Sequence, residues 1–358
     1  MRSFPDGSRS ALIESFRAGE ERALARAISV VEDQAPGFEA LLDELRPSVG
    51  RARRIGVTGP PGAGKSTLTA WFARLLRDEG NRVGIIAVDP TSPFTGGALL
   101  GDRIRMAELA IEPGVFIRSM ASRGSVGGLA TAATEAADLM DAFGFDRVIL
   151  ETLGVGQSEL EIAAAADSTV VVLVPESGDG IQAMKAGLME VADIFCVNKA
   201  DRPGADRLVK EIEVMKAIRA GRTMRGIPRH HARISAGSGS AELDVPASDE
   251  EESRSEDSPS AWEVPVFKTI ATEGEGIDEL AASIDGHFEV MRATGELEAR
   301  RSHALLDQTR RILIRRAETS ALRAWKAVES ELLEELLAGR MTPYSVAERL
   351  DRDAGDDK

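Results

Sequence analysis

The chain has 358 residues, of which 43% are hydrophobic, and it carries a formal net charge of −15 and one cysteine, Cys196. The hydrophobic content is enough for a large core, and the acidic charge argues against non-specific binding to nucleic acid or to an anionic membrane. A single cysteine excludes an internal disulfide, and we expect Cys196 to be a small core residue because it lies in an apolar run. No apolar run approaches the roughly 18 residues that cross a bilayer. The N-terminus lacks the apolar segment of a signal peptide, so a cytoplasmic protein is expected.

Residues 1–48 are expected to form an N-terminal helical extension. Apolar side chains recur at near-helical spacing across residues 11–33, which predicts one helix there. The Pro-Gly pair at 36–37 should interrupt the helical pattern, and a second short helix should end near Pro47.

From Arg54 onward, short β-branched runs alternate with helical segments. Nearly continuous apolar strands between helices predict a parallel sheet covered on both faces. The expected fold class is therefore α/β, a doubly wound, mostly parallel sheet that occupies residues 49–290. The runs expected to be strands lie at 54–59, 82–90, 114–120, 146–152, 168–175, 193–201 and 264–271.

Residues 240–260 differ in composition from the rest of this domain. They contain eight acidic residues and one basic residue among many serines. Such a segment cannot bury enough apolar surface to fold alone, so we predict a disordered acidic insertion. A docking tail is the functional alternative.

Residues 291–358 are expected to form a C-terminal helical arm. Apolar residues recur at three- and four-residue steps from Leu322 to Leu336, with charged residues between them. The arm could fold back on its own domain or form a dimer contact, and the pattern leaves both open.

The stretch GPPGAGKST lies between an expected strand and an expected helix and matches G-x-x-x-x-G-K-[ST]. Glycines let the backbone wrap round phosphate, and the N–H groups then form an anion nest at a helix N-terminus. Lys65 would bring a positive charge to the β- and γ-phosphates, and Ser66 would offer a hydroxyl to Mg²⁺. The predicted phosphate-binding residues are Gly59, Pro60, Pro61, Gly62, Ala63, Gly64, Lys65, Ser66 and Thr67.

The stretch NKAD, with Asn198, Lys199 and Asp201, follows an apolar run and so should lie at the carboxyl end of a strand, where α/β sheets bind ligands. A carboxylate there can accept hydrogen bonds from the ring N–H and the exocyclic amine of guanine. Adenine would leave that carboxylate facing an acceptor, which predicts a preference for GTP and GDP. A second loop that contacts the base is expected at Ile270, Ala271 and Thr272.

Acidic residues at two further strand ends are candidates for Mg²⁺ and for catalysis beside the phosphate loop and its lysine. Glu151 ends one strand, at the position of a Walker-B acid, and Gly154 could sense the γ-phosphate. Asp89, Asp102 and Arg105 lie in a loop after another strand. They could hold Mg²⁺ or its waters, activate water or neutralise charge, although Asp102 could equally cap a helix.

With these motifs the chain resembles the MeaB/ArgK family of P-loop GTPases, the methylmalonyl-CoA mutase-associated GTPases. The resemblance covers about residues 10–350 apart from the acidic insertion. It is carried by "GPPGAGKST", "VDPTSPFTGGALLGDRIRM", "FIRSMASRGSVGGLA", "ETLGVGQSE", "GDGIQAMKAG" and "NKADRPGAD". The usual family phrase "ETVGVGQSE" differs here only by Leu153.

The resemblance implies a homodimeric GTPase that uses Mg²⁺ and chaperones an adenosylcobalamin-dependent acyl-CoA mutase, most commonly methylmalonyl-CoA mutase. Such proteins gate cofactor loading and protect the mutase from inactivation. The resemblance also implies a switch loop around Pro175–Lys185. This chain departs from the family there, because the family usually has glycine near Glu176 and an acid where Gly180 stands.

Two other classes of protein share parts of this pattern. A nickel-insertion GTPase would need a metal-binding segment rich in histidine or cysteine, whereas this chain has one cysteine and four histidines. A transport-associated ATPase or kinase of the lysine/arginine/ornithine type is a competing description of the family. Transport and partitioning ATPases commonly carry a second lysine early in the phosphate loop, where Pro60 and Pro61 stand, and they lack NKAD.

Overall fold

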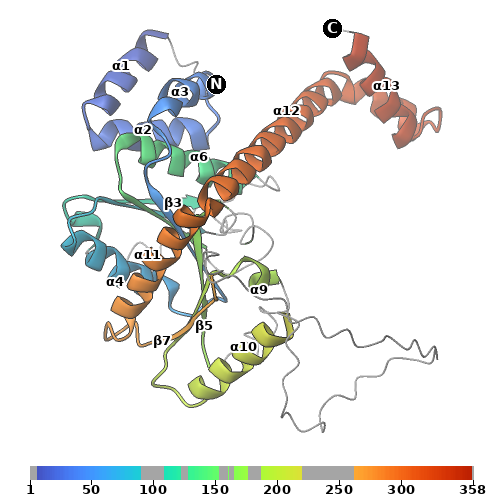
Figure 1. Ribbon diagram of the computed structural model, residues 1–358. Coiled ribbons are helices and arrows are strands. Elements are labelled where there is room, and N and C mark those ends of the chain that lie inside the picture. The colour runs from blue at the N-terminus through green and yellow to red at the C-terminus, as the bar shows by residue number, and fades with distance from the viewer. Residues whose placement is uncertain are drawn as a thin grey trace, which may run out of the picture.

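Seven parallel strands form one sheet in the order β3-β2-β4-β1-β5-β6-β7 (Figure 1). The structure is a computed structural model that describes residues 6–89, 109–121, 128–152, 160, 165–175, 187–219 and 262–356. The strands are β1 Arg53–Thr58, β2 Val83–Asp89, β3 Val115–Ala121, β4 Arg147–Thr152, β5 Ser168–Leu173, β6 Ile194–Asn198 and β7 Val266–Thr269. Each of the seven apolar runs in the sequence overlaps one of these strands, so the predicted α/β fold is confirmed.

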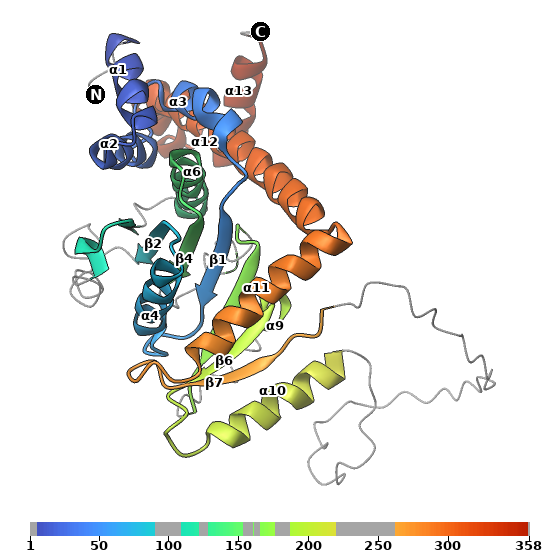
Figure 2. The ribbon, with the colours of Figure 1, turned by 60° about the vertical axis from the view of Figure 1, so that its left-hand side comes forward.

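Helices cover both faces of this sheet. The described helices are α1 Asp6–Arg17, α2 Glu21–Glu32, α3 Phe38–Leu45, α4 Lys65–Asp78, α6 Gly128–Phe143, α9 Met189–Val191, α10 Ala205–Arg219, α11 Ile277–Thr294, α12 Glu296–Leu337 and α13 Pro343–Asp356, with short 3-10 helices at Arg46–Ser48 and Leu109–Ile111. Helices α4 and α11 pack on one face, against strand residues such as Ile55 and Val172 (Figure 2). Helix α6 packs on the other face over β2 and β4, and α10 packs beside it over β5 and β6.

The N-terminal residues form three helices, with α2 packed on α6. The single helix predicted across residues 11–33 was wrong, because α1 ends at Arg17 and α2 begins at Glu21. Gly19 lies between them with a φ of 81°, a left-handed conformation that suits glycine and ends the first helix.

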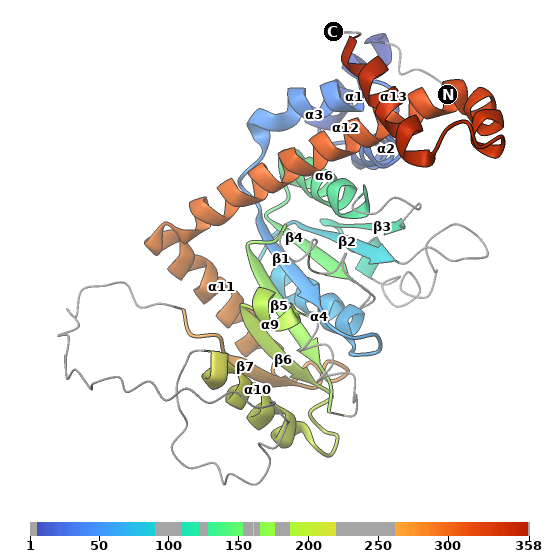
Figure 3. The same cartoon turned by 90° about the vertical axis from the view of Figure 1, so that its right-hand side faces the viewer.

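The C-terminal arm begins with a rod of 42 residues, α12, which turns off α11 at Gly295. Its first half crosses α6, and its far end projects from the domain and meets α13 (Figures 1 and 3). Within this helix the structure buries only Leu297 and Leu332. Leu306 and Leu313 are more than half exposed, at 68% and 60%.

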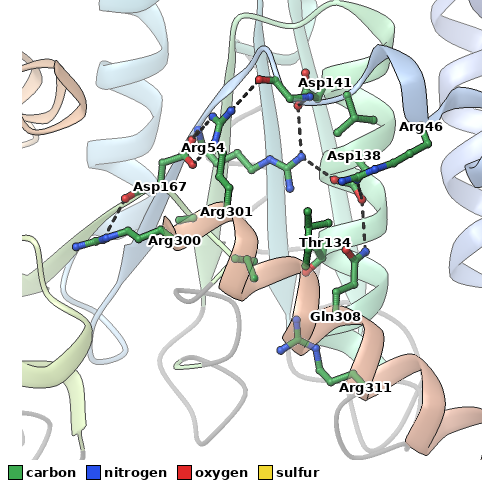
Figure 4. Close-up of a pocket in the computed structure, with 16 residues that line it drawn as sticks. Arg46, Arg54, Thr134, Asp138, Asp141, Asp167, Arg300, Arg301, Gln308 and Arg311 are labelled. Carbon is green, nitrogen blue, oxygen red and sulfur yellow. Dashed lines mark hydrogen bonds and ion pairs between the residues drawn. The ribbon is translucent and has the colours of Figure 1, made fainter. Parts of the chain in front are cut away.

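Buried ion pairs anchor the root of this arm to the end of the sheet where the strands begin. Arg301 of α12 bonds both carboxylate oxygens of Asp167 at 2.8 Å, and Arg300 bonds Asp193 at 2.7 Å. Figure 4 shows Arg301 and Asp167 beside a pocket that also contains Arg54 and Asp138, whose closest atoms lie 2.6 Å apart. Such networks hold elements together chiefly because removing one partner leaves the other charge buried and uncompensated, which is strongly destabilising.

Candidate nucleotide site

The predicted site residues that the structure describes gather at one edge of the sheet. Strands β1, β4, β6 and β7 are parallel, so their carboxyl ends meet at that edge, where open α/β sheets bind ligands. The stretch Gly59–Gly64 joins β1 to α4, and α4 begins at Lys65. The predicted strand–loop–helix context of the phosphate motif is therefore present.

Two glycines of the phosphate loop are required by close packing. A Cβ atom at Gly59 would lie 2.0 Å from the carbonyl oxygen of Val172 in β5, and Gly59 has a φ of 138°. A Cβ atom at Gly64 would lie 2.4 Å from the side-chain amide of Asn198. The loop is thus pressed against two neighbouring strands, and any side chain at these positions would force it away.

Lys65 lies folded over the phosphate loop. Its Nζ donates to the carbonyl oxygens of Gly59 at 2.8 Å and Pro60 at 2.9 Å, and the residue is 5% exposed. The ammonium group is therefore held above the loop at the N-terminus of α4, where the helix dipole also favours an anion.

Ser66 and Glu151 bring two oxygen ligands together beside the loop. The Ser66 hydroxyl donates to Glu151 Oε1 at 2.5 Å, and both residues are buried. A hydroxyl and a carboxylate are hard oxygen donors of the kind that Mg²⁺ prefers, so this pair fits the metal. One residue after Glu151, Thr152 donates to Thr58 Oγ1 at 2.9 Å and joins the ends of β4 and β1.

Asn198 connects the NKAD stretch to both loops. Its amide nitrogen donates to the carbonyl of Ala63 at 2.8 Å, and its oxygen accepts from the Ala271 N–H at 3.0 Å. The Thr269 hydroxyl also donates to that oxygen, at 3.1 Å. One buried side chain therefore holds the phosphate loop, β7 and the loop after it in fixed relation.

The next residues of NKAD point toward solvent and the phosphate loop. Lys199 adopts a φ of 57°, which is uncommon for a residue with a side chain, and its Nζ donates to the Gly62 carbonyl at 2.8 Å. Asp201 is exposed.

The loop after β7 is compact. Ile270 and Glu275 form an antiparallel bridge, and the Glu273 N–H donates to the Ile270 carbonyl at 2.9 Å. Ala271 is buried and Thr272 is exposed. Gly276 closes the loop with a φ of 75°, and a Cβ atom there would lie 2.3 Å from the Lys268 carbonyl.

Sequence reasoning missed Thr269, which supports Asn198 and also lies 3.1 Å from the Cys196 sulfur. Its place as the last residue of a strand, directly before the expected base loop, was the signal that could have found it. Cys196 is fully buried, as predicted, and burial raises the pKa of its thiol to about 12.

Several predicted residues lie outside the described residues. These are Asp102, Arg105, Gly154, residues 176–185 of the predicted switch loop and the acidic insertion 240–260. The backbone of Asp89 ends β2 at the site edge. In the part of the chain that is described, no helix combines the length and apolarity needed to cross a bilayer.

The sheet and its phosphate loop define the protein as a P-loop NTPase. The family model for the methylmalonyl-CoA mutase-associated GTPase MeaB matches residues 24–329, so the chain belongs to this GTPase family. The chain is 40% identical over 337 residues to a putative GTPase of Pyrococcus horikoshii, covering 94% of this chain and 95% of that one. It is 35% identical to a probable GTPase of Mycobacterium bovis, covering 97% and 96% of the two chains. The crystal structure of a LAO/AO transport system kinase is similar over 98% of both chains, with 27% identity and a TM-score of 0.62.

Proposed function

We propose that this GTPase reads guanine through NKAD and the loop after β7. The observation that carries the proposal is the position of Asn198, which bonds both the Ala63 carbonyl and the Ala271 N–H. This arrangement would hold Asp201 and the Ile270–Thr272 backbone around one base while the phosphate loop holds the same nucleotide's phosphates. Base choice and phosphate binding then depend on one buried residue.

Lys65 and the backbone of Gly59–Thr67 would bind the phosphates. The Lys65 ammonium, which now bonds two loop carbonyls, would turn to the β- and γ-phosphate oxygens and compensate their charge. Ser66, Glu151, Asp89 and Asp102 would hold Mg²⁺ directly or through water. When bound, Mg²⁺ neutralises the charge that develops on the phosphates during transfer.

We further propose that hydrolysis serves an adenosylcobalamin-dependent acyl-CoA mutase, with methylmalonyl-CoA mutase as the first candidate. The support is the description of the matching family as mutase-associated. In this proposal the protein is a homodimer that assists and protects the mutase, and the exposed apolar residues of α12 are available for the dimer contact. The cytoplasmic location stays a prediction from the sequence.

The test is single-turnover GTP hydrolysis measured with and without the cognate mutase. Switch-like GTPases hydrolyse slowly until a partner orders the catalytic groups, so we expect the mutase to accelerate turnover. By linkage, the mutase should also bind the GDP and GTP-analogue forms with different affinities. Equal rates and equal affinities would remove the case for a mutase-coupled switch. A competition assay with adenine nucleotides separates the proposal from a transport-associated ATPase.

A further inference from the structure

Trp71 lies on α4, the helix that begins in the phosphate loop, but its side chain is not part of the core. The residue is 37% exposed, whereas Ala70 and Phe72 on either side are buried. Its ring packs against Gly274 in the loop after β7, where a Cβ atom would lie 3.2 Å from two ring carbons. The ring therefore contacts the loop that is proposed to meet the base.

A cation from the same helix also lies over the ring. The guanidinium carbon of Arg74 lies 5.9 Å from the centre of the Trp71 ring, and Arg74 pairs with Glu112 at 3.5 Å. A cation over an indole face is attractive, and the ion pair restricts where that cation can lie. The Trp71 ring therefore contacts both a cation of its own helix and the turn at Gly274.

Among the described residues, the loop is attached to the rest of the domain at Ala271. The Ala271 N–H donates to Asn198 and its side chain is buried in the core, while the Ile270–Glu275 bridge joins the ends of the loop. Gly274 adopts a φ of 77°, so the turn needs glycine both for its backbone conformation and for the close approach of the ring. The Trp71 ring packs against the turn at this glycine.

We propose that Trp71 is a positioning residue for guanine binding, which holds the Ile270–Thr272 backbone against the base by bracing Gly274. The inference rests on the proposed base contacts of this loop and assigns a new role to a residue outside every nucleotide motif. Lys65 and Ser66 begin α4, the helix that carries Trp71, and Glu151 lies on β4. None of these three residues belongs to the loop that the ring braces, so losing the brace should weaken nucleotide retention and leave phosphate chemistry intact.

The experiment compares Trp71→Ala and Trp71→Phe with the parent full-length protein, using release of a fluorescent GDP analogue and steady-state GTP hydrolysis. In Trp71→Ala we expect release to accelerate about tenfold and KM for GTP to rise, because an aromatic contact of this size holds the loop. We expect kcat at saturating GTP to follow the parent. Trp71→Phe retains a ring and should restore release to within about twofold of the parent.

A spectroscopic readout follows from the tryptophan content. The chain has three tryptophans, Trp71, Trp262 and Trp325, so Trp262→Phe with Trp325→Phe leaves Trp71 as the only indole. In that background, GDP binding should change the emission of Trp71, because the base orders the loop that the ring touches. Trp325→Ala, on the distant arm, is the matched control and should release nucleotide at the parent rate.

Three results would overturn the proposal. They are unchanged release in Trp71→Ala, a fall in kcat without a rise in KM, or Trp71 emission that does not respond to GDP. Chemical unfolding of each variant checks that the fold survives, and Trp71→Leu replaces the alanine variant if that one unfolds. Failure here is distinguishable from failure of base reading, since Asp201→Asn should still lose GTP affinity when only the Trp71 proposal is wrong.

Discussion

The side-chain amide of Asn198 donates to the carbonyl of Ala63 at 2.8 Å, across 135 positions of sequence. This bond ties the end of β6 to the phosphate loop. Because the same side chain accepts the Ala271 N–H at 3.0 Å, a nucleotide that fits one loop meets the other in a set position. The preorganisation of two loops by one buried amide reduces the ordering that binding would otherwise require.

Asn198→Ala tests this arrangement. The substitution leaves the Ala63 carbonyl and the Ala271 N–H without this partner, so we expect GDP affinity to fall about tenfold or more and stability to fall by about 2 kcal/mol. Calorimetric titration and chemical unfolding measure the two effects. Asn81→Ala, which removes an amide that bonds the Leu76 carbonyl far from the site, is the control. An unchanged GDP affinity in Asn198→Ala would show that the two loops are set independently.

Asp201→Asn should change base preference. The carboxylate is expected to accept from the guanine ring N–H and amine, whereas an amide would instead donate to the exocyclic oxygen of xanthine. We therefore expect weaker GTP binding and relatively stronger binding of xanthine nucleotides, measured by competition. Asp206→Asn removes an exposed carboxylate that pairs with Lys268 nearby and controls for the charge change. If Asp201→Asn binds GTP as the parent does, Asp201 does not read the base.

Lys65→Ala should separate folding from hydrolysis. The ammonium donates to two carbonyls of the phosphate loop, and its charge is expected to serve the phosphates in transfer. Turnover should therefore fall by about 10²-fold or more, while the circular dichroism spectrum matches the parent. The control is Lys216→Ala on α10, where the ammonium pairs with Glu213. Parent-like turnover in a folded Lys65→Ala protein would exclude this role.

The sequence was sufficient to predict the sheet and the loops at its edge, for identifiable reasons. Strands such as Ile194–Asn198 are buried at every position and apolar up to Val197, because both faces of the sheet are covered. Glycine is spaced in the phosphate motif as its backbone requires. The contacts of Trp71 and Thr269 could not be predicted. Trp71 contacts Gly274, and Thr269 bonds Asn198 at a separation of 71 positions. Both contacts join residues that lie far apart in the sequence, and no local pattern records such contacts.

The junction between α6 and the arm holds a buried carboxylate that no motif indicated. Glu135 of α6 is 1% exposed and bonds Arg315 of α12 at 3.2 Å. Burial raises the pKa of the Glu135 carboxyl from 4.5 to about 7. Arg315 opposes this rise, and the charges of Asp138 and Glu39 add to it. The carboxyl thus joins the arm to the domain while titrating close to neutral pH.

This raised pKa predicts a pH dependence of stability with a definite sign. Between about pH 4.5 and pH 7 the folded protein holds a proton on Glu135 that the unfolded chain has released, so the free energy of unfolding falls as pH rises through that window. The 2.5-unit difference between 7 and 4.5 corresponds to at most about 3 kcal/mol. Glu135→Gln keeps a partner for Arg315 and cannot titrate, so its free energy of unfolding should fall less than the parent's between pH 5 and pH 8. Urea unfolding at a series of pH values measures the two slopes, and Glu331→Gln on α12, which removes the exposed partner of Arg349, controls for lost charge. Identical slopes in the parent and Glu135→Gln would show that this carboxyl does not titrate in the window, and the pH dependence would then belong to other groups.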